Sequence, residues 1–100
     1  MKFKTIVGTV TLTVERKIHI IQRHPIMDNY LVRIKEVLEV PDETRYSHYS
    51  DTILLFYRYF DNIEGGKYIA VVVNIKDLQV KTAYLTNRIK SGRKYVKEKF

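Results

Sequence analysis

Two of the three histidines in this chain, His19 and His24, lie in the stretch ERKIHIIQRHP together with Arg16 and Arg23. An imidazole has an unperturbed pKa of about 6.5, so it can donate or accept a proton near neutrality. Metal-free cleavage of an RNA phosphodiester needs a base for the 2′-hydroxyl, an acid for the leaving oxygen and cations for the phosphate. These residue types therefore make the stretch a candidate acid–base site for a phosphodiester.

Other side chains suited to the same chemistry lie further along the chain. Thr82 and Tyr84 project to one face of a predicted last strand, because alternate strand residues share a face. Arg58 is a lone charge in LLFYRYF, and burying it is costly unless it is paired or lines a site. Eight tyrosines offer rings on which bases can stack. Further candidate phosphate or RNA contacts are the basic side chains Lys81, Arg88, Lys90, Arg93 and Lys94.

Each of these residues also has a purely structural interpretation. His19 fits an ordinary surface histidine on a helix, and His24 fits a helix-end residue that bonds a last carbonyl. Arg58 fits an outer-face arginine with a packed stem. Thr82 is a good strand former that needs no further role. For each residue the sequence leaves both interpretations open. Only the residues taken together favour an RNA substrate.

Metal and cofactor sites are not predicted. His19 and His24 are five residues apart and would diverge by about 140° on a continuous helix. The chain has no cysteine and no known metal-ligand spacing. Gly65 and Gly66 suit a turn, because no lysine–serine pair and no predicted helix follow them.

The apolar pattern predicts the elements that must position these residues. Helices are expected over 15–23, ended by Pro25, and over 27–39. In the first helix, Ile18 and Ile21 are expected on one side, with Arg16, His19 and Arg23 on the opposite side. Strands are expected over 5–14, 52–60, 67–76 and 78–85, with a hairpin turn at 61–66 and an edge strand or loop at 42–51. Residues 87–100 read as a basic helix or tail. The order predicts one α+β domain over 1–100, with two N-terminal helices on an antiparallel sheet of about four to five strands and a short basic C-terminal helix.

The charge of the chain suggests an anionic partner. The net charge is +7, and it is concentrated in residues 1–24, with five basic and one acidic side chain, and 85–100, with six and one. These ends would form a basic patch if the fold brought them together. No apolar run approaches the roughly 18 residues of a membrane span, and the N-terminal segment reads as a strand. We therefore expect a cytoplasmic protein with no membrane partner.

Several segments resemble a known group of proteins. The runs VTLTVERKIHIIQRHP, YLVRIKEVLEVPDE, LLFYRYF, KYIAVVVNI and VKTAYLTNRIKSG, from about Val10 to Gly92, resemble small phage and bacterial members of the barnase–EndoU–colicin–RelE-like nucleases. The resemblance implies a curved sheet and a metal-independent endoribonuclease, toxin-like or a phage effector. It implies His19 as the first catalytic candidate, with Arg23 and His24 beside it, Thr82 and Tyr84 across the sheet, and Arg58 on the phosphate.

Two alternatives belong to other functional classes. One is a non-catalytic RNA-binding module that uses the same basic and tyrosine-rich surface. The other is a protein-interaction domain that docks an acidic protein. For the ribonuclease, the expected partners are RNA, such as tRNA or mRNA, and a cognate inhibitor protein. The sequence also leaves the oligomeric state open, because an exposed strand edge around 46–50 could pair with a second copy in a homodimer.

Overall fold

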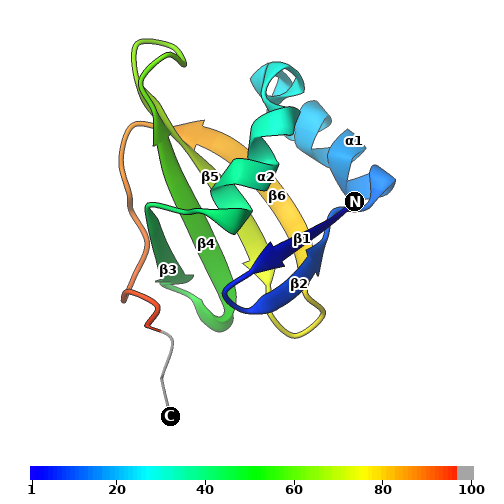
Figure 1. The fold of residues 1–100 in the computed structure, drawn as a ribbon, viewed down its shortest axis with the longest axis vertical. Coiled ribbons are helices and arrows are strands. Elements are labelled where there is room, and N and C mark those ends of the chain that lie inside the picture. The colour runs from blue at the N-terminus through cyan, green and yellow to red at the C-terminus, as the bar shows by residue number, and fades with distance from the viewer. Residues whose placement is uncertain (97–100) are drawn as a thin grey trace.

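The computed structural model describes residues 1–96, which fold around a curled sheet (Figure 1). Two short 3₁₀ helices, η1 (Pro25–Asn29) and η2 (Leu31–Arg33), join the two α-helices. The other elements are, in chain order, β1 (Lys2–Thr5), β2 (Gly8–Thr11), α1 (Val14–Arg23), α2 (Ile34–Glu39), β3 (Glu43–Ser47), β4 (Ser50–Phe60), β5 (Lys67–Asn74) and β6 (Gln79–Thr86). The predicted α+β class is confirmed.

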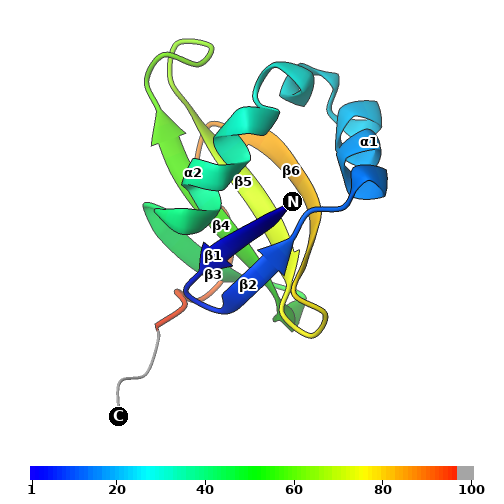
Figure 2. The ribbon, with the colours of Figure 1, turned by 45° about the vertical axis from the view of Figure 1, so that its right-hand side comes forward.

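The sheet is mixed and larger than expected. Within residues 1–96 it has six strands in the order β1-β2-β6-β5-β4-β3, where we expected an antiparallel sheet of four to five. Neighbouring strands are antiparallel except for β2 and β6, which run parallel and pair only at Thr11 and Gln79. Because that ladder is so short, most of β6 is left without a strand neighbour on this side. Helix α1 packs there instead (Figure 2).

The extra strand comes from the N-terminal segment, where a single strand over 5–14 was predicted. The chain turns back at 6–7, so that β1 and β2 form a hairpin in which Thr5 pairs with Gly8. The Thr5 hydroxyl stabilises the turn by donating to the Gly8 carbonyl oxygen and accepting from the Val7 N–H. Gly8 adopts φ +117°, which an L side chain rarely adopts. The alternation of threonine and aliphatic residues concealed this turn.

Helix α2 lies in the hollow of the curled sheet, and we call the sheet face toward it the inner face. Ile34, Val37 and Leu38 are fully buried there, against β1, β4 and β5. The main core also contains Phe56 and Val71. The opposite, outer face carries a second apolar cluster, built on the buried residues Leu55, Tyr57 and Ala70. Strands β4 and β5 are therefore apolar on both faces, as expected for central strands.

The predicted second helix over 27–39 is divided into η1, η2 and α2. Asp28 and Asn29 are weak helix formers, and Tyr30 between the two 3₁₀ helices has φ −125°, outside the helical range. The α-helical part is the one whose side chains fill the core.

No helix in residues 1–96 is long and apolar enough to cross a membrane.

Residues 87–96 form an extended strap rather than the predicted basic helix. The strap leaves β6, crosses the outer face, where Ile89 packs on the second cluster, and ends beside β3. Tyr46 of β3 donates its N–H to the Arg93 carbonyl oxygen and accepts from the Gly92 N–H, both at 2.9 Å. The expected open edge for a second copy is thus paired, at Tyr46, with the protein's own chain. The rest of the predicted tail, 97–100, lies outside the described residues.

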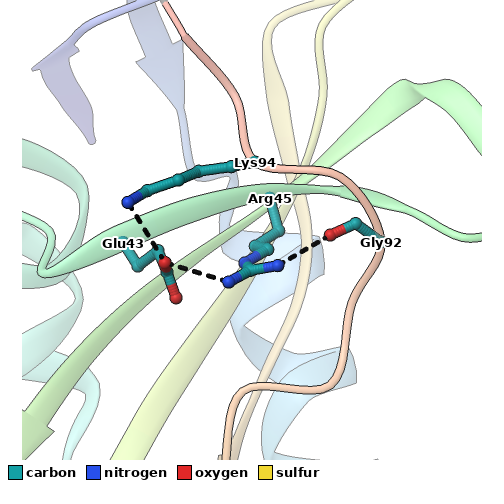
Figure 3. Close-up of polar contacts among 4 residues, drawn as sticks. All are labelled: Glu43, Arg45, Gly92 and Lys94. Carbon is teal, nitrogen blue, oxygen red and sulfur yellow. Dashed lines mark hydrogen bonds and ion pairs between the residues drawn. The ribbon is translucent and has the colours of Figure 1, made fainter.

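Polar side chains fasten the strap to β3 (Figure 3). Arg45 donates to Glu43 Oε1 and to the Gly92 carbonyl oxygen, each at 3.0 Å. The Lys94 ammonium lies 3.5 Å from the same Glu43 oxygen. These contacts hold the pKa of the Glu43 carboxyl below its usual range, mainly through the hydrogen bond from Arg45. Lys94, which was expected to contact RNA, thus contributes to the structure here.

Candidate active site

Helix α1 carries the first half of the predicted site. Thr13 caps its N-terminus by accepting a hydrogen bond from the Arg16 N–H at 3.2 Å, an interaction typically worth about 1 kcal/mol. At the other end, the helix stops before Pro25, and His24 takes φ −136° and ψ 76°. The predicted helix end is confirmed. Since His24 is not helical, the 140° divergence from His19 does not apply.

The buried side of α1 differs from the prediction. Ile20 is fully buried in the core, whereas Ile18, expected on the buried side, is 52% exposed. The helix packs beside β6 along a stripe centred on Ile20. His19 is next to that stripe and is half-buried, so it is not on a fully solvated face.

Strand β6 supplies the second half of the site through a β-bulge. The register between β5 and β6 shifts at Lys81, which is one residue more than the pairing needs. Because of this extra residue, Val80 and Ala83 both reach the main core although they are three residues apart. Thr82 and Tyr84 consequently share the outer face. Bulges are common next to active sites because they redirect side chains in this way.

The two halves meet in one pocket. His19, Arg23, His24 and Thr82 line an open cavity of about 260 Å³. Four of the five residues predicted to be catalytic thus come together from two elements that are far apart in the sequence. None of these lining side chains is acidic, and Arg23 supplies a fixed positive charge. The cavity is smaller than the roughly 300–1,000 Å³ of sites for drug-sized ligands and suits a small anionic group such as a phosphate.

Tyr84, the fifth predicted catalytic residue, lies beside this pocket. Its ring centroid is 5.6 Å from that of His24, with a tilt of 37° between the rings. Burial raises the pKa of the Tyr84 phenol above its usual value of 10, and the neighbouring Tyr57 adds to the rise. Tyr84 is therefore a neutral hydroxyl at physiological pH and can donate a hydrogen bond.

The Thr82 hydroxyl has an unusual environment. Its oxygen is buried and has no hydrogen-bond partner anywhere in residues 1–96. A buried polar group left in this state costs about 1–3 kcal/mol, so most are paired. An unpaired hydroxyl in the wall of a pocket is a group that a ligand oxygen could satisfy.

Arg58, the predicted phosphate contact, does not line this pocket. It lies on the inner face of β4, on the same side as Phe56 and Phe60, whereas Thr82 and Tyr84 lie on the outer face. Its guanidinium donates to the Val40 carbonyl oxygen at 2.7 Å and lies 5.9 Å from the Phe60 ring centroid. The guanidinium is thus hydrogen-bonded at the end of α2 on the inner face, and not on the outer face that the structural interpretation of the sequence expected.

The other predicted RNA contacts are dispersed. Lys81 is paired with Asp77 at 2.7 Å, and the Arg93 guanidinium stacks 4.1 Å from the centroid of the Tyr46 ring. Lys94 is held at Glu43, at the β3 edge, which is three strand spacings from β6, or roughly 14 Å. The remaining candidates, Arg16, Arg88 and Lys90, line no part of the pocket, and the last two are exposed.

The sequence did not single out Tyr57 as a neighbour of the site. Tyr57 pairs with Ala70, which pairs with Tyr84, so the small Ala70 side chain lies between the two tyrosines on the outer face. In the sequence Tyr57 is only one tyrosine in a strand that is apolar on both faces. Its place beside Tyr84 follows from the pairing register of β4, β5 and β6, which the sequence does not give. In the described part of the chain no three His, Asp or Glu side chains are grouped so as to hold a metal ion.

Comparisons of the chain with protein-family models, curated proteins and solved structures found no match. The geometry of the pocket and the resemblance of the sequence segments are therefore the observations that bear on function.

Proposed function

We propose that the pocket between α1 and β6 is the active site of a metal-independent endoribonuclease of the barnase–EndoU–colicin–RelE-like kind. One observation carries the proposal: His19, Arg23, His24 and Thr82, selected from the sequence for this chemistry, line a single cavity. Two imidazoles and a guanidinium in one small pocket provide an acid, a base and a phosphate-binding cation.

In this reaction one imidazole removes the proton from the ribose 2′-hydroxyl, and that oxygen attacks the phosphorus. The bond from phosphorus to the 5′-oxygen breaks, and the other imidazole, initially protonated, gives its proton to the leaving oxygen. The products are a 2′,3′-cyclic phosphate and a 5′-hydroxyl, with no further reactant. His19 and His24 take the two proton-transfer roles.

The remaining residues act on the phosphate oxygens. Arg23 offers a planar guanidinium that can hold two of these oxygens at once. Thr82 gains the hydrogen-bond partner that it lacks within residues 1–96. The neutral phenol of Tyr84, next to His24, donates to an oxygen on which charge develops during the attack.

The proposal is tested through the nucleophile of the substrate. An RNA oligonucleotide and its 2′-O-methyl counterpart are incubated with the protein in EDTA, and the fragments are identified by mass. We expect cleavage of the RNA alone, with 2′,3′-cyclic phosphate ends. Cleavage of the 2′-O-methyl oligonucleotide, or RNA products with a 3′-hydroxyl and a 5′-phosphate, would show that the 2′-hydroxyl is not the nucleophile and would refute the proposed mechanism.

A further inference from the structure

The outer face of the sheet carries a row of four tyrosines, of which the proposed reaction uses only Tyr84. Tyr59 of β4 pairs directly with Tyr68 of β5, and their ring centroids are 5.2 Å apart at an interplanar angle of 69°. Tyr68 also meets Tyr57 edge to face, at 6.3 Å and 88°. We call Tyr57, Tyr59, Tyr68 and Tyr84 the tyrosine strip.

The tyrosine strip is continuous with the pocket. Tyr57 and Tyr84 lie on either side of Ala70 in one cross-strand row, and the Tyr84 ring packs against His24. The register of the strands thus carries the strip from the pocket wall across β6, β5 and β4, toward the turn between β4 and β5. Figure 1 shows these three strands side by side and the turn. Because Tyr57 is buried and Ile89 of the strap packs on the same cluster, a ligand that extends from the pocket along this face meets the outer rings, Tyr59 and Tyr68, rather than an unbroken row of rings.

The outer end of the strip is accessible and fixed in place. Tyr59 is 46% exposed, unlike Tyr57, which is buried at the base of the strip. The Tyr59 hydroxyl occupies the space that a Cβ at Gly66 would need. A glycine at this position therefore allows the close approach that places the Tyr59 ring.

Cations border the strip. Arg88 follows Thr86, the residue that pairs with Tyr68, and it is exposed with no carboxylate in ion-pair distance within residues 1–96. Lys67 lies next to Tyr68 and donates to the Asn87 side-chain oxygen. Residues 87–96 contain four basic side chains and no acidic one. Aromatic rings beside a cation such as Arg88, which has no ion-pair partner in residues 1–96, match the two parts of a nucleotide, the base and the phosphate.

We propose that the tyrosine strip binds the bases of single-stranded RNA whose scissile phosphate occupies the pocket, with Tyr59 and Tyr68 as stacking platforms. The inference rests on the proposed function and specifies its substrate class. Bases in a duplex are stacked on one another and cannot reach these rings, so the strip selects for unpaired RNA. The tyrosine faces do not distinguish one base from another, so the preference is for strand state rather than for sequence.

Binding of a 2′-O-methyl oligonucleotide, measured by fluorescence anisotropy as a single strand and as a duplex, tests the strip separately from cleavage. We expect the single strand to bind more tightly, and Tyr59→Ala to weaken its binding about tenfold, the loss typical of one stacked base. Tyr59→Phe keeps the ring and should bind as the wild type does. The matched control is Tyr49→Ala, because Tyr49 is 97% exposed at the β3–β4 turn, outside the strip.

The inference is overturned if Tyr59→Ala binds the single strand as tightly as the wild type does, or if Tyr49→Ala weakens binding as much as Tyr59→Ala does. It is also overturned if the duplex binds as tightly as the single strand. If thermal unfolding shows that Tyr59→Ala does not fold, Tyr59→Leu, which keeps an apolar residue in the strand, replaces it. Wild-type cleavage of RNA with unchanged binding by Tyr59→Ala refutes the strip but not the nuclease. Weaker binding by Tyr59→Ala in a protein that never cleaves RNA supports the strip and refutes the nuclease.

Discussion

The Thr82 hydroxyl is buried in the pocket wall without a partner in residues 1–96, so it should lower stability and serve substrate binding. Valine has nearly the same shape and removes the unpaired group. We expect Thr82→Val to raise the melting temperature by about 5 °C, as for a gain of about 1 kcal/mol. RNA cleavage should fall about ten- to hundredfold, because a hydrogen bond to a charged oxygen is lost. Calorimetry and cleavage rates measure the two effects.

Thr86 provides the matched control on the same strand. Its hydroxyl donates to the Arg88 carbonyl oxygen and accepts from the Arg88 N–H, so Thr86→Val should lower the melting temperature. If Thr82→Val destabilises the protein as Thr86→Val does, the Thr82 hydroxyl is not an unsatisfied group.

The residues of the pocket were more predictable than their arrangement. Helical spacing alone put His19 and Arg23 on one side of a helix, and Pro25 indicated that the helix ends at His24. Arg58 was expected at the phosphate but lies on the inner face, because a strand that is apolar on both sides gives no signal for which face a residue occupies. The bulge at Lys81, which sets the face of Thr82, has no signature in the sequence.

At the scale of elements, the strap depends on Glu43 for its attachment to β3. Its carboxyl has a lower pKa in the folded protein than the usual 4.5, so its contribution is present above about pH 4.5 and is lost as the pH falls through the lower folded value. We expect Glu43→Gln to lower the melting temperature at pH 7 by about 4–8 °C, as for about 1 kcal/mol. At a pH below the folded pKa of Glu43, the variant and the wild type should unfold alike.

Glu36→Gln is the control for this effect. Glu36 pairs with Arg33 on an exposed helix surface, where such pairs are worth about 0.3–0.5 kcal/mol. The assigned role of Glu43 would be contradicted if Glu36→Gln lowered the melting temperature as much as Glu43→Gln does. It would also be contradicted if the deficit of Glu43→Gln did not shrink as the pH is lowered below 4.5.

Elements with a strong apolar period were predictable. Helix α1, strands β4, β5 and β6, and the turn at 61–66 follow the spacing of their buried residues. The β1–β2 hairpin was missed because its turn residues, Ile6 and Val7, are apolar and continue the strand pattern. The segment of the strap was predicted to be a basic helix or tail, yet its backbone pairs with β3, a long-range contact that no local pattern encodes.

At the scale of the whole molecule, the two basic ends of the chain contribute differently. Arg23 from the N-terminal part lines the pocket, whereas Arg93 and Lys94 are engaged at β3, three strands away from β6. The net charge of +7 still favours a polyanion in general. It is the pocket and the neighbouring tyrosine strip, rather than one continuous basic patch, that give the RNA interpretation a defined location.

Cleavage of total RNA in EDTA, compared between the wild type, His19→Ala, His24→Ala and His48→Ala, decides whether the pocket is a ribonuclease site. His48 is the matched control, because its ring contacts the Lys90 carbonyl oxygen at the strap and does not line the pocket. We predict that the wild type and His48→Ala cleave alike, and that each pocket variant is at least about a hundredfold slower, as loss of general acid–base catalysis requires. No cleavage by the wild type, or cleavage that neither pocket substitution slows, would show that His19 and His24 do not form a ribonuclease site.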